Sequence, residues 1–182
     1  MADIIIETER LILRTQAAAD FDIYMQHINT PAVRRYLGGV EEAHEAEAAF
    51  ARSAANQARE GFSFWFAALK ETGTLIGICG LKRIDADAAP AEIKGDFEIG
   101  WILREDCWGK GYASEAAAAS LNHAFARLSA PHVTALTSES NAASWRMMEK
   151  LGMERRRDLE FDDSAFPPED NPTIVYRIDR KH

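Results

Sequence analysis

The chain has 182 residues, with 29 acidic and 21 basic side chains, a formal net charge of −8 at pH 7 and 47% hydrophobic residues. This length is typical of one domain, and the composition excludes a wholly disordered chain. The acidic balance argues against general binding to nucleic-acid phosphates. The longest uninterrupted apolar run, Phe64 to Leu69, is far shorter than the roughly 18 residues of a membrane helix. We therefore expect one domain over residues 1–182 that binds neither nucleic acid nor a membrane.

Cysteine, histidine and the N-terminal residues bear on location and metal binding. Cys79 and Cys107 are too few for a disulfide framework, and both are expected to be small buried apolar residues. The stretch from Met1 to Glu7 is acidic, whereas a signal peptide starts with positive charge. The spacing of the five histidines is not that of metal ligands; they are His27, His44, His123, His132 and His182. The sequence predicts a cytoplasmic protein without a metal site.

The first 61 residues predict one strand and three helices. The expected elements are a strand over residues 11–13 and helices over residues 17–28, 31–37 and 41–60. Thr30 followed by Pro31 is typical of an N-cap and a first helical position. Gly38 and Gly39 end that short helix, and Gly61 ends the long one, because glycine readily adopts the left-handed conformation found after helices.

The middle of the chain predicts a β-hairpin, a further strand and a helix. The expected elements are strands over residues 62–70, 75–84 and 97–103, a loop over residues 85–90, and a helix that starts at Ala113 and ends before Pro131. The first two strands flank a short turn and therefore form the hairpin. Apolar spacing predicts that the helix buries Ala118, Leu121, Phe125 and Leu128.

The last third completes an alternating pattern of strands and helices. The expected elements are a strand over residues 132–138, a helix over residues 141–151, and strands near Leu159 and over residues 174–178. Such a mixture predicts a single α/β (α+β) domain with about seven strands.

The turn between the strand over residues 97–103 and the next helix has the chemistry of an anion site. Gly109 and Gly111 leave the backbone open to close approach. The first turn of the helix adds unpaired N–H groups and the positive end of the helix dipole. Lys110 adds a positive charge. A bound phosphate group is one interpretation of this turn, and a tight strand-to-helix connection without a ligand is the other.

Two common phosphate-binding motifs do not match this turn. The chain lacks the Gly-x-x-x-x-Gly-Lys-Ser/Thr string of a P-loop. The third glycine of a dinucleotide-binding Gly-x-Gly-x-x-Gly motif is replaced by Ser114, and the acidic residue about twenty positions later is missing. Both ATP and nicotinamide chemistry are therefore disfavoured.

Several strings of the chain resemble a known family. Residues 108–113, Trp-Gly-Lys-Gly-Tyr-Ala, resemble motif A of the GCN5-related N-acetyltransferase (GNAT) family, with Trp108 in place of the usual Gln or Arg. Residues 141–153 resemble motif B. Residues 8–14, Thr-Glu-Arg-Leu-Ile-Leu-Arg, resemble the start of the branch that contains the ribosomal-protein N-terminal (RimJ/RimL-type) acetyltransferases. The resemblance implies a single GNAT domain, whose central, mostly antiparallel sheet is flanked by about four helices.

The resemblance implies that acetyl-coenzyme A binds at this turn. Backbone amides would hold the diphosphate, and the residues that carry them are Gly109, Lys110, Gly111, Tyr112, Ala113 and Ser114. Trp101, Ile102 and Leu103 match the strand that pairs with the pantetheine arm and whose bulge polarises the thioester carbonyl. Asn141 matches a residue that contacts the cofactor, although an asparagine there can also cap its own helix.

The resemblance also suggests an acid and a base. Glu98 matches the position of a catalytic glutamate, which removes the proton of the attacking amine directly or through water; the alternative is a solvent-facing strand residue. Met148 occupies the position at which many family members carry an acidic tyrosine. Ser144 is then the expected acid facing the thiolate, with a packing role as the alternative, and Tyr112 or Tyr176 as substitutes.

The sequence thus predicts an N-acetyltransferase that moves acetyl from acetyl-coenzyme A to a primary amine by direct attack. The resemblance places the acceptor between the helices over residues 17–37 and the loop over residues 162–171. A protein N-terminus, an amino acid, a polyamine and an aminoglycoside are the acceptors considered, and a homodimer is left open. The alternative, which the missing tyrosine supports, is an acyl-coenzyme A sensor or partner-binding module without turnover.

Overall fold

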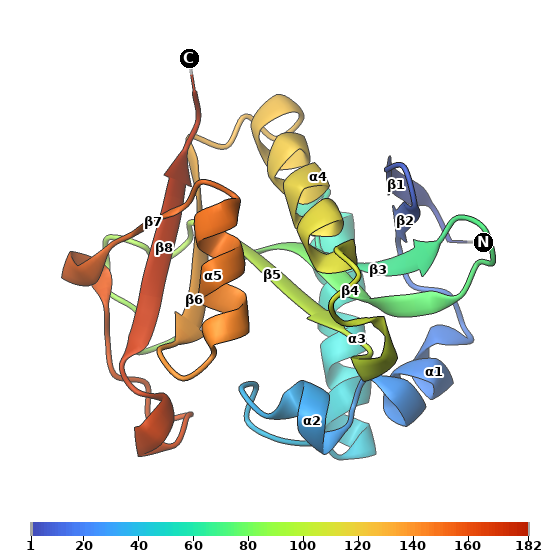
Figure 1. The fold of residues 1–182 in the computed structure, drawn as a ribbon, viewed down its shortest axis with the longest axis horizontal. Helices are drawn as coiled ribbons and strands as arrows, with labels where there is room; N and C mark the ends of the chain where they lie inside the picture. The colour runs from blue at the N-terminus through green and yellow to red at the C-terminus, as the bar shows by residue number, and fades with distance from the viewer. Residues whose placement is uncertain (1, 182) are drawn as a thin grey trace.

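The computed structural model describes residues 2–181, so Met1 and His182, which the expected domain includes, lie outside the described residues. An eight-stranded mixed sheet is covered by helices on both faces (Figure 1). The strands are β1 (Ile4–Glu7), β2 (Leu11–Arg14), β3 (Phe64–Leu69), β4 (Leu75–Arg83), β5 (Phe97–Leu103), β6 (His132–Ser138), β7 (Glu154–Arg155) and β8 (Thr173–Asp179). The helices are α1 (Asp20–His27), α2 (Pro31–Arg34), α3 (Ala43–Glu60), α4 (Tyr112–Ala126) and α5 (Ala142–Lys150), with 3-10 turns η1 (Glu105–Cys107), η2 (Arg157–Leu159) and η3 (Pro168–Asp170).

The helix ends on the N-terminal side follow the capping residues of the sequence. The hydroxyl of Thr30 accepts the Val33 N–H at the start of α2, as predicted. Glu42 and Glu45 form a reciprocal capping box at the start of α3, which satisfies two otherwise unpaired N–H groups. Gly61 follows α3 with a φ of +78°, in the left-handed conformation expected for a residue after a helix.

The sheet separates into two halves between β5 and β6. Its strand order is β1-β2-β3-β4-β5-β6-β8-β7, and β5–β6 is the parallel pair in an otherwise antiparallel sheet. All seven residues of β5 pair with β4, whereas one pair, Glu98 with Thr134, joins β5 to β6. Beyond this pair the strands diverge toward their carboxyl ends at Leu103 and Ser138. We call this opening the β5–β6 split.

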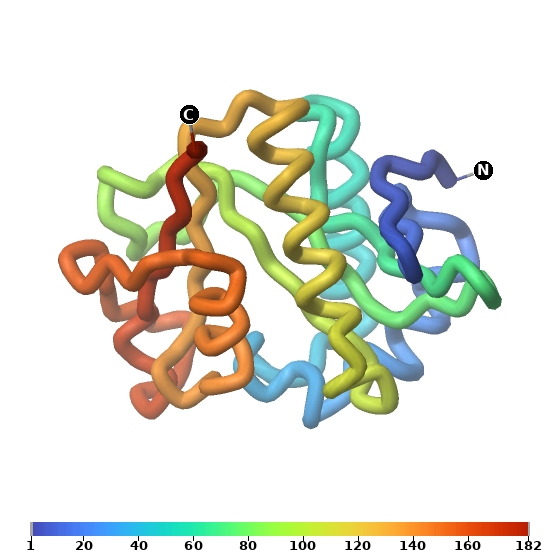
Figure 2. Tube along the Cα trace, turned by 45° about the horizontal axis from the view of Figure 1, so that its top comes forward, coloured from blue at the N-terminus to red at the C-terminus, as the bar shows by residue number. Residues whose placement is uncertain are grey.

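Two helical layers cover the sheet. Helices α4 and α5 lie on one face, and α1, α2 and α3 lie on the other (Figure 1). Phe97 and Ile99 of β5 belong to the apolar cluster beneath α4. Because side chains alternate along a strand, Glu98 between them faces the layer of α1 to α3. At the open end of the split, the segment around α2 lies between the start of α4 and the turn before α5 (Figure 2).

Three sequence expectations about the elements need correction. The sheet has an additional strand at the N-terminal end, β1 (Ile4–Glu7). Residues around Leu159 form η2 rather than a strand, and β7 lies earlier, at Glu154–Arg155.

The buried face of α4 also differs from the apolar spacing, since Ala118 is exposed and the buried residues are Ala116, Ala117, Ser120, Leu121 and Ala124. Leu121 is buried as predicted, and Phe125 and Leu128 are partly buried and pack against the same cluster, so the difference lies in Ala118 and in the small side chains that bring α4 close to the sheet.

Candidate active site

The glycine turn before α4 presents a run of free backbone donors at the open end of the β5–β6 split. Gly109 and Gly111 have φ values of +72° and +79°, which glycine adopts without steric cost. The N–H of Trp108 donates to Glu105 and that of Glu115 to Gly111. Six backbone N–H groups, those of Gly109 to Ser114, lie between these two. None of the six donates a hydrogen bond to an acceptor among residues 2–181. This run of donors at a helix N-terminus is the arrangement that binds a diphosphate, so the residues present fit the nucleotide end of acetyl-coenzyme A.

A polar network from the β1–β2 turn fixes the first turn of α4. The Glu115 carboxylate accepts hydrogen bonds from the Thr8 hydroxyl (2.6 Å), the Arg10 backbone N–H (2.8 Å) and Arg10 Nε (2.6 Å). Arg10 Nη1 also donates to the Lys110 carbonyl at 2.9 Å. Burial opposes ionisation of Glu115, but the bonds from Thr8 and Arg10 outweigh it and lower its pKa. Sequence reasoning missed this role, although Thr8 and Arg10 belong to the N-terminal string that indicated the family.

The strand β5 presents its edge to the split. It pairs with β4 without a register shift over residues 97–103, so the bulge expected at Trp101, Ile102 and Leu103 is absent from this ladder. A regular ladder is favoured because Gly77 allows very close approach, and a Cβ there would lie 2.2 Å from the Ile102 carbonyl oxygen. Trp108, in place of the usual Gln or Arg, is 49% exposed and donates its indole N–H to the Leu103 carbonyl at 2.9 Å.

Helix α5 borders the other side of the split. Asn141 is its N-cap residue but makes no side-chain capping bond, so the self-capping alternative is not observed. Ser144 is half-buried and follows Asn141 by three positions, which places both on one face of the helix. Met148, four residues further along this face, is 2% exposed and packs into the core. The position of the missing tyrosine is therefore filled by an apolar side chain.

Glu98 is a largely buried carboxylate at the closed end of the split. Its side chain is 15% exposed, and its Oε2 lies 3.3 Å from Lys82 Nζ. Burial raises the pKa of Glu98, and the charge of Lys82 partly opposes this shift. Lys82 also donates to Asp85 at 2.8 Å. The solvent-facing alternative is therefore wrong, and a raised pKa is the direction that favours a carboxylate as a proton acceptor.

The other acid candidates and both cysteines have structural partners. The Tyr176 hydroxyl donates to Glu149 at 3.2 Å, and burial raises its pKa. The Arg10 guanidinium lies over the Tyr112 ring, with its central carbon 4.6 Å from the ring centroid. Cys79 and Cys107 are buried as predicted; burial raises the pKa of Cys79 to about 12. Within residues 2–181 no group of three metal-ligating side chains is found, and none of the helices is long and apolar enough to cross a membrane.

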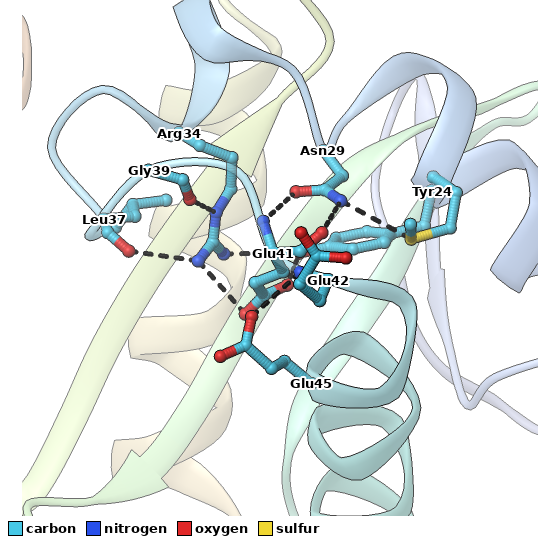
Figure 3. A network of polar contacts seen from close by, with 9 residues as sticks. Tyr24, Asn29, Arg34, Leu37, Gly39, Glu41, Glu42 and Glu45 are labelled. Carbon is cyan, nitrogen blue, oxygen red and sulfur yellow. Dashed lines mark hydrogen bonds and ion pairs between the residues drawn. The ribbon is translucent and has the colours of Figure 1, made fainter.

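A network around Arg34 orders the loop between α2 and α3 (Figure 3). Arg34 pairs with Glu41 at 3.0 Å and donates to the carbonyls of Leu37 (3.0 Å) and Gly39 (2.8 Å). The Tyr24 hydroxyl donates to Glu41 at 2.6 Å, which links the loop to α1. Because the largely buried Arg34 guanidinium bonds to several groups of the loop, it holds the loop in one conformation.

The turn after α2 also meets the other half of the sheet. The Tyr36 hydroxyl donates to the Ser140 carbonyl at 3.2 Å. Ser140 in turn donates to Asp170 at 2.6 Å. The segments expected to frame the acceptor slot, residues 17–37 and 162–171, are therefore linked through Ser140 at the open end of the split.

Comparisons with known proteins agree with this geometry. Residues 10–154 match the acetyltransferase (GNAT) domain model. The uncharacterised N-acetyltransferase p20 of Bacillus licheniformis is 30% identical over 158 residues, which cover 84% of this chain and 85% of p20. A crystal structure of an acetyltransferase from Agrobacterium tumefaciens is 31% identical with a TM-score of 0.77, and the match covers 96% and 94% of the two chains.

A more distant structural neighbour shares the fold. RimL, the ribosomal L7/L12 alpha-N-protein acetyltransferase, has been solved in complex with coenzyme A; it is 16% identical with a TM-score of 0.78, and the match covers 97% of this chain and 98% of RimL. The family model spans more than two thirds of the chain, and its match includes the glycine turn, Glu98 and α5. The chain therefore belongs to the GNAT acetyltransferase family and is an acetyltransferase.

Proposed function

We propose that this protein transfers an acetyl group from acetyl-coenzyme A to a primary amine by direct attack within a ternary complex. The observation that carries the proposal is the run of six unpartnered amides, Gly109 to Ser114, at the open end of a split whose closed end holds Glu98. Amides at a helix N-terminus suit the diphosphate. A carboxylate with a raised pKa suits removal of a proton from an ammonium group, which has no free electron pair for attack.

The remaining site residues complete the proposed mechanism. The backbone of Trp101, Ile102 and Leu103 pairs with the pantetheine arm along the edge of β5, and Asn141 contacts the cofactor from α5. Holding amine and thioester side by side supplies much of the rate, so no covalent enzyme intermediate is required. Ser144 faces the departing thiolate and donates a hydrogen bond to it, directly or through water. The half-buried position of Ser144 and the partners of Tyr112 and Tyr176 support this choice.

A protein N-terminus is the acceptor we place first. The fold shared with RimL and the RimJ/RimL-type start of the chain support this choice, while amino acids, polyamines and aminoglycosides are the small-molecule alternatives. We further propose that residues 1–182 form one catalytic domain, that it works in the cytoplasm, and that any homodimer leaves the split accessible.

An amine panel tests the proposed function. Purified protein is supplied with acetyl-coenzyme A and with short peptides bearing free N-termini, amino acids, polyamines or aminoglycosides, and the release of free thiol is recorded. We expect thiol release above background with at least one primary amine, and none when the same peptide carries a blocked N-terminus. The buried Met148 favours the sensor alternative, which predicts tight cofactor binding and background thiol release with every amine.

A further inference from the structure

Thr134 lies where β5 and β6 stop pairing. It is fully buried, with 0% of its surface exposed. Its Oγ1 has no hydrogen-bond partner among the residues that the structure describes. Because buried hydroxyl groups in folded proteins are nearly always hydrogen-bonded, an orphaned hydroxyl at this position indicates a partner that is not part of the chain.

Glu98 is the direct neighbour of Thr134 across the split. The two residues form the one register pair between β5 and β6. Adjacent strands lie roughly 4.8 Å apart, and paired residues project to the same face. Lys82 Nζ approaches the Glu98 carboxylate most closely at Oε2, at 3.3 Å. The Thr134 hydroxyl does not bond directly to the Glu98 carboxylate, and one water molecule can bridge two such groups on neighbouring strands.

We propose that the Thr134 hydroxyl holds a water molecule against the Glu98 carboxylate, and that this water relays the proton of the acceptor ammonium group to Glu98. The water accepts hydrogen bonds from Thr134 and from the acceptor nitrogen, and donates one to Glu98. When the acceptor N–H bond breaks, the proton joins the water as a water proton passes to Glu98, and the nitrogen electron pair becomes free to attack. The inference rests on the proposed function, and Thr134 acts in it as a positioning residue.

Thr134→Val removes none of the charged groups near Glu98 and Thr134, which include Arg177, the register partner of Thr134 on β8. Lys82 on β4 pairs with both Glu98 and Asp85. His132 Nε2, in the first residue of β6, lies 2.7 Å from Oδ2 of Asp96, the residue before β5. A change in the titration of Glu98 after substitution of Thr134 alone therefore reports the link between these two residues.

Thr134→Val tests the proposal, with Thr134→Ser as the matched control that keeps the hydroxyl. Valine has nearly the shape of threonine and lacks its hydroxyl, so we expect the fold to be retained, with a thermal midpoint close to that of the wild type. The Glu98 carboxyl carbon is followed by 13C NMR across pH, with the signal assigned from Glu98→Gln. We expect Thr134→Val to raise the Glu98 pKa by about 0.5 unit or more, because the anion loses a bridged hydrogen bond, and Thr134→Ser to titrate like the wild type.

Kinetics add a second, independent readout. With the best amine of the panel, we expect Thr134→Val to lower kcat about tenfold, to move the acidic limb of the pH–rate profile to higher pH and to leave the KM for acetyl-coenzyme A unchanged. Thr134→Ser should recover most of kcat. An unchanged Glu98 titration in Thr134→Val overturns the proposal whatever the activity. A wild type that acetylates no amine refutes the proposed function instead, and the titration still decides whether Thr134 reaches Glu98 through water.

Discussion

Glu98 combines burial with a neighbouring cation. The carboxylate is 15% exposed, and Lys82 lies 3.3 Å away. Burial raises the pKa of Glu98 more than Lys82 lowers it. In the folded protein the group therefore binds its proton more tightly than in the unfolded chain. Its contribution favours folding at low pH and is lost as pH rises from the unfolded value of about 4.3 through the raised folded value.

Glu98→Gln should separate catalysis from stability. We expect kcat to fall about a hundredfold or more, and the acidic limb of the pH–rate profile to disappear. The thermal midpoint above neutral pH should not fall, because the substitution removes a buried charge and Lys82 keeps its bond to Asp85. Glu71→Gln, in the exposed turn after β3, is the control. A kcat and profile like those of the wild type would exclude Glu98 as the base.

At the scale of elements, the start of α4 depends on the chain segment more than one hundred residues before it. Thr8 and Arg10 both donate to Glu115 in the first turn of the helix, and Arg10 also donates to the Lys110 carbonyl. These bonds orient the glycine turn, whose own amides stay free. Because the pKa of Glu115 is lowered by these donors, the stabilisation is present at neutral pH and is lost as pH falls through the folded pKa.

Glu115→Gln should therefore affect cofactor binding before it affects chemistry. We expect the KM for acetyl-coenzyme A to rise about fivefold or more with a smaller change in kcat, since the substitution loosens the binding turn and leaves Glu98 in place. The loss in thermal midpoint should be largest at neutral pH and shrink in acid, as pH falls from the unfolded value of about 4.3 through the lowered folded pKa of Glu115. Glu47→Gln, on the exposed side of α3, serves as a control. An unchanged KM would contradict a role for Glu115 in shaping the turn.

At the scale of the molecule, the proposed binding site for acetyl-coenzyme A and the proposed base lie on opposite faces of the sheet. The free amides lie at the start of α4, which covers one face, and Glu98 projects toward the layer of α1 to α3 on the other. The β5–β6 split joins the two faces. Binding of acetyl-coenzyme A should therefore stabilise the whole domain, because a ligand that binds the native state alone adds its binding free energy to that of folding.

A thermal-shift series tests which part of acetyl-coenzyme A contributes most to binding. At a hundredfold excess over Kd, we expect acetyl-coenzyme A and coenzyme A each to raise the midpoint by about 5–10 °C. S-acetylpantetheine lacks the diphosphate and should give a much smaller shift at the same concentration. Equal shifts for all three compounds would show that the glycine turn contributes little to binding.

The parts of the fold that depend on local chemistry were predictable from the sequence. Thr30, Gly61 and the glycine turn act through their own backbone conformations, so α2, α3 and the start of α4 follow from neighbouring residues. Apolar spacing found the larger core residues of α4 but not its buried alanines, because these owe their burial to the closeness of the sheet. Likewise, the ion pair of Glu98 with Lys82 and the contact of Glu115 with Arg10 join distant segments, and no local pattern reports them.

The bond between Tyr36 and the Ser140 carbonyl has a consequence for the cohesion of the domain. It crosses the open end of the split and joins the segment after α2 to the turn before α5. The two halves of the sheet, which share a single register pair between β5 and β6, are therefore also tied together at the opposite end of the split.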